Sequence, residues 1–316
     1  MRDEVEKIAW LTARFELAGS SDDLIVGIGD DAAVFDFGNR PTIVTVDAQV
    51  EGVHFRRPML SLVELGARAM IAAASDVLAM AATPLGSVIA LTLPEEYPDA
   101  DFRGLIDGLA DAARRTSARV IGGNLSGGPA LSITTTVFGR AVAEPLTRRG
   151  ARPGDALYVT GTLGAAALGF QILDTERTEI PAAARFIDRW RIPPVHVGLA
   201  AKLATVATAA VDISDGLLQD AGHLCRASGV GATVRAEALP ALPGFVETCA
   251  ELELDPLELS LAGGEDYEIL FTAPSSDAAR SIATEVGLVE EGSAVRVVDR
   301  EGAELSTGST GFRHFS

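Results

Sequence analysis

Lysine is nearly absent from this chain of 316 residues. Lys7 and Lys202 are its only lysines, and no segment has the pattern G-x-x-x-x-G-K-[ST]. In that pattern a glycine-rich loop wraps phosphate groups and its lysine reaches them. The sequence therefore excludes a Walker-type nucleotide site. Any cation that holds a phosphate has to be an arginine or a metal ion.

Cysteine and histidine are also scarce. Cys225 and Cys249 are too few for a disulfide framework or a thiolate zinc site. The four histidines are His54, His196, His223 and His314. They form no H-x-x-x-H pair and no group with the cysteines, so neither zinc nor nucleophilic catalysis is indicated. Only His54 lies near acidic motifs, and the other three are interpreted as surface or capping residues.

Long apolar runs are missing as well. The longest candidate, residues 70–82, contains Asp76, so we expect no membrane-spanning segment. The first residues, MRDEVEKIAW, lack the apolar stretch of a secretory signal, and the expected location is the cytoplasm. The net charge of −18 argues against nucleic acid as a partner. The same charge would repel an anionic ligand unless metal ions intervene.

The length favours two domains over one. Residues 143–155, AEPLTRRGARPGD, are polar and rich in turn formers, which places a boundary between residues 1–142 and 143–316. Strands and helices alternate in both parts, but hairpin-like successions also occur. We therefore expect an α/β fold (mixed α+β), with a mixed sheet covered by helices on one face in the N-terminal domain and an α/β C-terminal domain.

The periodicity of apolar residues predicts the individual elements. The expected helices span residues 5–16, 62–82, 101–116, 195–208, 217–228 and 277–287, and a further helix is expected to start at 161–164. The expected strands span residues 42–46, 87–93, 119–123, 131–140, 156–160, 209–216 and 267–273.

Acidic residues recur where the predicted strands end or where the surroundings are apolar. They are Asp30, Asp31, Asp47, Asp76, Asp212, Asp215, Glu265 and Asp266. Taken singly, each is explained by a turn or a helix cap. Asp76 is different, because a carboxylate inside an Ala/Met/Leu helix has to be paired or bound to metal, and the one basic residue nearby, Arg68, is two turns away. Several carboxylates without matching lysines are what oxygen-ligated Mg²⁺ needs.

Two glycine-containing segments follow predicted strands. They are VIGGN, residues 120–124, and VTGTLG, residues 159–164. Each is either a tight turn or a loop whose backbone N–H groups face phosphate oxygens. Arg148, upstream of the second segment, is either the bidentate cation that lysine does not supply or a solvated linker arginine.

An ordered set of motifs gives these residues a family resemblance. The segments GIGDDAAVF, VDAQVEGVHF, ASDVLAMAATP, IGGN, RRGARPGDALYVTGTLG, DISDGLLQDAGHLCRASGVGA, LAGGEDYEILFT and TGFRHF resemble the thiamine-monophosphate kinase family, in order and along nearly the whole chain. Single motifs are shared with the wider superfamily that includes aminoimidazole ribonucleotide synthetase and selenophosphate synthetase.

The resemblance implies ATP- and Mg²⁺-dependent phosphorylation of thiamine monophosphate to thiamine diphosphate. It implies a homodimer in which residues 1–142 dimerise and bind metal and ATP, while residues 143–316 bind phosphate and substrate. The metal positions would be Asp30, Thr45, Val46, Asp47, Asp76, Asn124, Asp212 and Asp215, with several Mg²⁺ ions bound. The positions that contact ATP would be Gly123, Asn124, Arg148 and Ser214. The positions that hold thiamine phosphate would be His54, Glu265 and Phe312.

No catalytic base is expected. The acceptor is a phosphate monoester with a second pKa of about 6, so it is largely ionised near neutral pH. Positioning and charge neutralisation supply most of the catalysis in phosphoryl transfer. The C-terminal Phe312 is interpreted either as an anchor for the tail or as a ring that stacks on the pyrimidine.

Three positions depart from the family pattern. Asn124 stands where the family has Asp, and its side chain offers a carbonyl oxygen without a charge. Val46 stands where the family often has Thr, so only its backbone carbonyl is available as a ligand. Ala165 stands where an acid is expected. Two alternatives therefore stay open. One is a nucleotide-binding homologue with weak or lost turnover, and the other is a related ATP-dependent enzyme with another acceptor.

Overall fold

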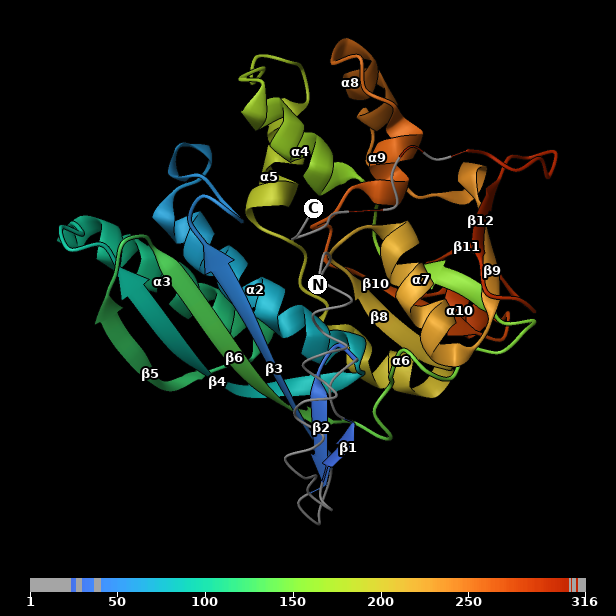
Figure 1. Ribbon diagram of the computed structural model, residues 1–316, viewed down its shortest axis with the longest axis horizontal. Coiled ribbons are helices and arrows are strands. Elements are labelled where there is room, and N and C mark those ends of the chain that lie inside the picture. The colour runs from blue at the N-terminus through green and yellow to red at the C-terminus, as the bar shows by residue number, and fades with distance from the viewer. Residues whose placement is uncertain (1–23, 27–29, 37–40, 307, 309–310, 312–316) are drawn as a thin grey trace, which may run out of the picture.

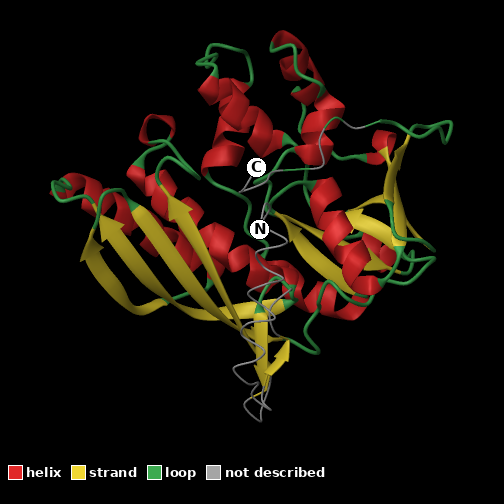
Figure 2. Cartoon of the chain, in the orientation of Figure 1, coloured by secondary structure: helices red, strands yellow, loops and turns green. Residues whose placement is uncertain are grey.

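The computed structural model describes residues 24–26, 30–36, 41–306, 308 and 311, and it arranges them as two sheets with helices packed against them (Figures 1 and 2). The predicted helix at residues 5–16 and Phe312 lie outside the described residues. The predicted mixed α/β class is confirmed. Among the described helices, none combines the length and the apolar character that crossing a membrane requires.

The first sheet has six strands in the order β1-β2-β3-β6-β4-β5. Strands β4 and β5 are parallel, and all other neighbours are antiparallel, so the sheet is mixed as predicted. The strands are β1 (Leu24–Val26), β2 (Ala33–Asp36), β3 (Pro41–Val50), β4 (Ala82–Leu93), β5 (Val120–Gly127) and β6 (Ser132–Ala141).

Two long helices, α2 (Leu62–Ala79) and α3 (Asp99–Thr116), cover one face of this sheet (Figure 1). A short 3-10 turn, η1 (Arg57–Met59), precedes α2. Helix α2 begins at its predicted position because Ser61 and Glu64 form a capping box. The two helices approach closely at glycine: a Cβ atom at Gly108 would lie 1.9 Å from the Val63 carbonyl oxygen.

The second sheet also has six strands, in the order β12-β9-β11-β7-β10-β8. Strands β12 and β9 are parallel, and the other neighbours are antiparallel. The strands are β7 (Ala156–Val159), β8 (Ala209–Ile213), β9 (Gly231–Arg235), β10 (Glu268–Ala273), β11 (Thr284–Glu290) and β12 (Val295–Val298). The three strands β7, β8 and β10 are buried throughout.

Helices bury both faces of these central strands. Leu224 of α7 packs with Val211 on one face, and Leu203 of α6 packs with Phe271 on the other. Helices α4, α5, α8 and α9 stand above the second sheet, and α5 contacts α2 (Figure 1). The helices and 3-10 turns of this half are α4 (Ala165–Asp174), α5 (Ala183–Arg191), η2 (Val197–Leu199), α6 (Ala200–Val206), α7 (Leu217–Ser228), η3 (Ala236–Ala238), α8 (Phe245–Glu251), α9 (Pro256–Ala262) and α10 (Asp277–Arg280).

Several predicted boundaries are wrong. The helix predicted at residues 277–287 ends at Arg280, because residues 284–290 pair as β11 with β7 and β9. The helix predicted at 62–82 ends at Ala79, and Ala82 already pairs in β4. The helix predicted at 195–208 is shorter, spanning 200–206, and helix α5 was not predicted. Pairing with distant strands decided the first two boundaries, and local periodicity does not report such pairing.

Two corrections affect site residues. Strand β3 was predicted to stop before Asp47, but it runs on to Val50 and places Asp47 inside the strand. The segment VIGGN was predicted to end a strand with a loop, but Gly123 and Asn124 lie within β5, paired in parallel with β4. In both cases the partner strand extends the ladder beyond the apolar run.

Candidate active site

A pocket of about 400 Å³ lies between the two halves of the molecule. Strand β3, the turn after it and helix α2 line one side; helix α4 and the loops around β8 and β10 line the other. The lining residues are Val46, Asp47, Gln49, Val53, His54, Ala72, Asp76, Ala167, Phe170, Gln171, Asp212, Ser214, Asp215, Gly264, Glu265 and Tyr267. Carboxylates and apolar side chains thus share one concave site, which suits a ligand that has both charged and ring-like parts.

The Asp76 carboxylate projects from the last turn of α2 toward β3. Thr45 Oγ1 donates a hydrogen bond of 2.5 Å to Asp76 Oδ2 and lies 3.4 Å from the Asp31 carbonyl oxygen. Burial raises the pKa of Asp76 well above its ordinary value, and the carboxylates of Asp212 and Asp31 raise it further. The hydrogen-bond partner is a neutral hydroxyl, so the charge of Asp76 is left for a cation to balance.

Asp30, Asp31 and Arg148 form the next part of the site. Arg148 Nε donates a hydrogen bond of 2.6 Å to Asp31 Oδ1, and Asp31 Oδ2 is buried and accepts no hydrogen bond from any described residue. Burial raises the pKa of Asp31 to about 8, although Arg148 lowers it. The Asp30 carboxylate accepts the backbone N–H groups of Asp31 (2.9 Å) and Arg148 (3.1 Å). Arg148 is therefore an ion-pair partner inside the site and not a solvated linker residue.

Strand β8 delivers three predicted residues to the same place. Asp212 is buried near the end of the strand, and Ser214 and Asp215 follow in the pocket wall. Burial raises the pKa of Asp212, while a hydrogen bond from Ser75 lowers it. Gln219 Nε2 donates a hydrogen bond of 2.8 Å to Asp215 Oδ2. The strand end thus presents two carboxylates beside those of Asp31 and Asp76.

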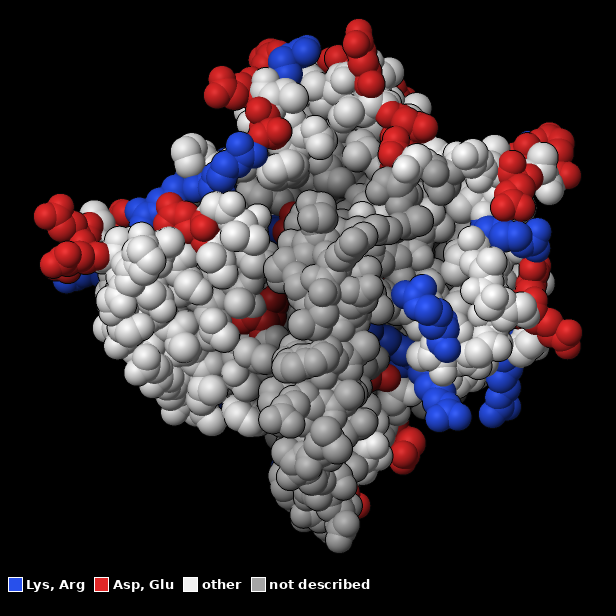
Figure 3. Space-filling model, viewed as in Figure 1, with Lys and Arg blue, Asp and Glu red and all other residues white. Residues whose placement is uncertain are grey.

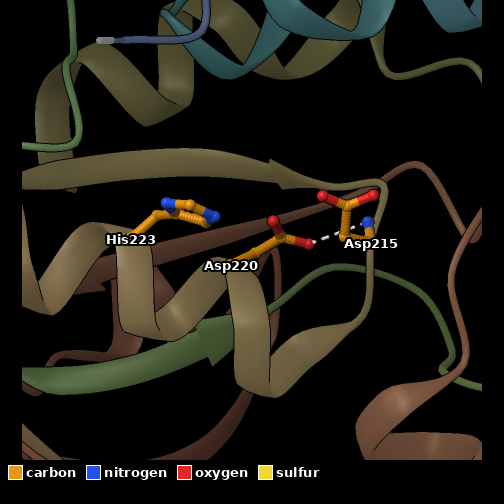
Figure 4. A group of neighbouring side chains, drawn as sticks. All are labelled: Asp215, Asp220 and His223. Atoms are coloured by element: carbon orange, nitrogen blue, oxygen red, sulfur yellow. Dashed lines mark hydrogen bonds between the residues drawn. The ribbon is translucent and has the colours of Figure 1, made fainter. Parts of the chain in front are cut away.

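Asp215 also belongs to a group that could hold a metal ion, together with Asp220 and His223 of α7 (Figure 4). One ligand atom from each lies within 4.8 Å of the others. Asp220 Oδ2 accepts the N–H groups of Asp215 and Gly216, both at 3.2 Å. Burial lowers the pKa of His223 to about 4, which keeps the ring neutral near pH 7. Sequence reasoning missed Asp220 and interpreted His223 as a surface or capping residue, although their three-residue spacing places both on one side of a helix.

Figure 3 shows both signs of charge on one face of the molecule. Acidic side chains stand mostly around the outer edge, and basic side chains gather in one group at the lower right and another at the upper left. The net charge of the chain is −18. A polyphosphate that approaches this protein therefore needs cations at the site itself.

Glu265 lies in the pocket wall and is held by two residues from other elements. The guanidinium of Arg68, fully buried on α2, donates to Glu265 Oε1 and to the Trp190 carbonyl oxygen. Trp190 Nε1 donates a hydrogen bond of 2.7 Å to Glu265 Oε2, and the Arg68 guanidinium carbon lies 4.8 Å from the centre of the Trp190 ring. Arg68 is thus the partner of Glu265. In the sequence analysis, Arg68 was weighed only as a partner for Asp76, two helical turns away.

The segment VTGTLG does not offer its N–H groups to a phosphate. Gly164 N (2.6 Å) and Ala166 N (3.1 Å) donate to the Asp266 carboxylate, which caps the start of α4. Leu163 N donates to the Pro240 carbonyl oxygen at 2.9 Å. Of the two interpretations of this segment, these contacts favour the structural turn, because a carboxylate and a carbonyl of the protein take the N–H groups of Gly164 and Leu163.

The structure separates Gly123 and Asn124 from the other predicted residues. Both are exposed on β5, and three steps across the sheet divide β5 from β3. Neighbouring strands lie about 4.8 Å apart, so the separation is about 14 Å. Within one chain, these two residues therefore lie away from the pocket that holds Asp47.

His54 and Val46 both line the pocket. His54 follows β3 in the pocket wall, and its Nδ1 accepts the Val50 N–H at 3.1 Å. Val46 also lines the pocket, with 62% of its surface exposed. An apolar side chain there supplies no ligand atom, which leaves its carbonyl group for that role.

Comparison with known proteins places this architecture in a family. Residues 29–141 match the family model for the AIR synthase related protein N-terminal domain, and residues 152–302 match the one for the C-terminal domain. The chain is 34% identical to a thiamine-monophosphate kinase of Aquifex aeolicus over 91% of this chain and 92% of that protein. It is 37% identical to the thiamine-monophosphate kinase of Escherichia coli K12 over 80% of this chain and 77% of that protein.

A solved structure gives the same result in three dimensions. AaThiL complexed with AMPPCP and TMP superposes with a TM-score of 0.89 at 32% identity, over 99% of this chain and 97% of that one. Since these relatives match over most of both chains and the ordered motifs agree, the chain belongs to the thiamine-monophosphate kinase family.

Proposed function

We propose that the protein phosphorylates thiamine monophosphate with ATP, in the cytoplasm, to give thiamine diphosphate and ADP. The observation that carries the proposal is the pocket, where buried carboxylates share a wall with His54, Phe170 and Tyr267. A phosphate oxygen of thiamine monophosphate forms a bond to the γ-phosphorus of ATP. The bond from that phosphorus to the β–γ bridging oxygen breaks, and ADP leaves. The acceptor oxygen is already ionised, so the protein needs no general base.

The donor set fits Mg²⁺. Carboxylate and hydroxyl oxygens are the ligands that this ion prefers. Burial, together with neighbouring carboxylates, raises the pKa of Asp76 and Asp212, so a bound cation would stabilise their charged forms. The residues that would hold several ions are Asp30, Thr45, Val46 through its carbonyl, Asp47, Asp76, Asn124, Asp212 and Asp215. Bound Mg²⁺ would neutralise the phosphate oxygens and hold the two substrates together.

The chain's own residues have distinct tasks in this proposal. Arg148, with its guanidinium fixed by Asp31, offers its remaining N–H groups to ATP phosphates, and Ser214, which lines the pocket, also contacts ATP. His54 and Glu265 hold thiamine phosphate, and Phe312 stacks on its ring. Gly123 and Asn124 contact ATP. Both parts of the chain therefore share the proposed site. Residues 1–142 supply metal and ATP contacts together with His54, and residues 143–316 supply phosphate and substrate contacts together with the metal positions Asp212 and Asp215.

We also propose a homodimer formed through the first sheet. Strand β5 is exposed along its whole length, and Val120, Ile121 and Leu125 expose 47%, 70% and 61% of their surfaces. Exposed apolar side chains on an edge strand mark a surface that a second chain covers. Pairing would also give Gly123 and Asn124 a route to a nucleotide that their own chain keeps about 14 Å away.

The test is an assay of thiamine diphosphate formed from thiamine monophosphate and ATP at varied Mg²⁺. We expect turnover, and we expect Asn124→Asp to lower the Mg²⁺ needed for half-maximal rate by about tenfold, because a charged ligand replaces a neutral one. Ser126→Asp, two residues along the same strand, is the matched control and should leave it unchanged.

The other outcomes separate the alternatives. If calorimetry shows that ATP binds but neither the wild type nor Asn124→Asp forms product, the protein is a homologue that has lost turnover. If Asn124→Asp forms product and the wild type does not, the missing charge at position 124 is the cause of the lost turnover. Product with a different phosphorylated acceptor, and none with thiamine monophosphate, would move the protein to another substrate.

A further inference from the structure

Gln49 occupies an unusual place in the pocket wall. Alternate residues of a strand share a face, so Thr45, Asp47 and Gln49 all point from β3 toward α2. Gln49 is opposite Ile133 of β6 in the sheet register, and it lines the pocket together with Ala72 of α2. Only 3% of its surface is exposed. A long polar side chain is thus buried where the pocket meets the core.

The side-chain oxygen of Gln49 has no hydrogen-bond donor. Its Oε1 is buried and accepts no hydrogen bond from any residue that the structure describes. On the same face, the Thr45 hydroxyl is satisfied by Asp76 and by the Asp31 carbonyl. Leaving a buried acceptor unpaired is costly, and most buried polar groups in native proteins have a partner. A leucine would fill a similar volume without that cost.

The neighbours of Gln49 indicate what the missing donor is. Asp47 lies two residues away on the same strand face, about 7 Å along β3, and belongs to the carboxylates proposed to hold metal and phosphate. The same pocket is lined by Val53, Phe170 and Tyr267, which suit a flat ring system. Glu265, another acceptor that lines the pocket, already receives hydrogen bonds from Arg68 and Trp190 on its two oxygens. The oxygen of Gln49 is left open.

We propose that Gln49 is a specificity-determining residue that accepts a hydrogen bond from an N–H donor on the ring system of the acceptor substrate. This inference rests on the proposed function. In thiamine monophosphate, the donor of this class is the exocyclic amine of the aminopyrimidine. Gln49 thereby selects an amino-substituted ring over one that carries an acceptor at the same position.

The test compares wild type and Gln49→Leu with two substrates: thiamine monophosphate and an analogue in which an oxo group replaces the ring amine. We expect Gln49→Leu to lower kcat/KM for thiamine monophosphate about tenfold, with the KM for ATP unchanged. The preference for the amine over the oxo analogue should fall by about the same factor, since the variant and the analogue remove the same contact. The ligand-free Tm should stay equal or rise, because an unpaired buried amide is gone.

Tyr97→Phe is the matched control. The Tyr97 hydroxyl is another buried oxygen without a partner among the described residues, but it does not line the pocket. Its removal should leave the substrate preference unchanged.

Two results would overturn the role of Gln49. Gln49→Leu could lower kcat/KM equally for both substrates, which is a structural effect, or it could change neither. The proposed function fails separately, when wild type makes no thiamine diphosphate. In that case calorimetric binding of the same two ligands still reads the amine preference of Gln49, and equal binding by wild type and variant rejects it.

Discussion

The acid-rich site and a second group of buried polar residues balance negative charge in opposite ways. In the site, the carboxylates of Asp212 and Asp31 raise the pKa of Asp76, Asp212 also raises that of Asp31, and Arg148 pairs with Asp31. Burial and repulsion act in the same direction there. The carboxylates are more numerous than the cations that the chain supplies.

The second group, here called the Glu268 network, surrounds one carboxylate of β10. Glu268 is fully buried, and Arg189 Nη2 donates to its Oε1 at 2.6 Å. Thr160 Oγ1 donates to Oε2 at 2.7 Å, and His196 Nε2 lies 2.8 Å from the same oxygen. Each oxygen has a partner from the protein. Unlike the carboxylates of the site, Glu268 therefore has a paired arginine and a hydrogen-bond donor on each of its oxygens.

The largest expected effect comes from neutralising one carboxylate of the acid-rich site. Asp76→Asn should lower kcat by about three orders of magnitude, because a proposed metal ligand at the transferring phosphate is lost. The same change should raise the metal-free Tm, since it removes a buried charge that its neighbours repel. Steady-state kinetics and thermal unfolding without metal check both. Asp107→Asn, exposed on α3, is the control, and a fall in metal-free Tm for Asp76→Asn would contradict the comparison.

The opposite response is expected in the Glu268 network. Glu268→Gln should reduce the free energy of unfolding by about 3 kcal/mol, because it leaves the Arg189 charge without its buried partner. Adding Arg189→Met should recover part of the loss, since neither charge is then stranded. Denaturant unfolding of the two variants measures this. If the double variant is as unstable as the sum of the single changes, the pair is not coupled.

The smallest effect concerns the cap beside that network. Burial raises the pKa of Asp266 to about 7, although hydrogen bonds from Ala166 and Gly164 lower it. A carboxyl whose pKa is higher in the folded state than its ordinary value of 3.8 loses stabilisation as pH rises from about 4 to about 7. Compared with wild type, Asp266→Asn should therefore show a flatter decline of unfolding free energy over that range. Parallel slopes in the two proteins would show that Asp266 does not titrate there.

Much of the fold could be predicted from the sequence. Helix α7 has its predicted bounds, 217–228, because an apolar stripe and a terminal Gly229 are local signals. Helix α5 was not predicted. Its apolar residues Phe186 and Trp190 are buried against partners that lie elsewhere in the chain. Strand β11 was predicted as part of a helix because its pairing with β7 and β9 is a long-range contact. The type of an element could thus be predicted from the local pattern of apolar residues, whereas its length depended on the strands with which it pairs.

The site shows the same division. The sequence by itself determined which carboxylates are available, that lysine cannot serve phosphate, and that an acid at position 76 needs an explanation inside an apolar helix. Only the tertiary structure decided that Arg148 pairs with Asp31, that Arg68 pairs with Glu265, and that no described residue donates a hydrogen bond to the Gln49 side-chain oxygen in the pocket wall. Residue types and spacings fix the chemistry that a chain can offer. Charge balance and hydrogen-bond partners depend on contacts between residues far apart in sequence, and these exist only once the two sheets have come together.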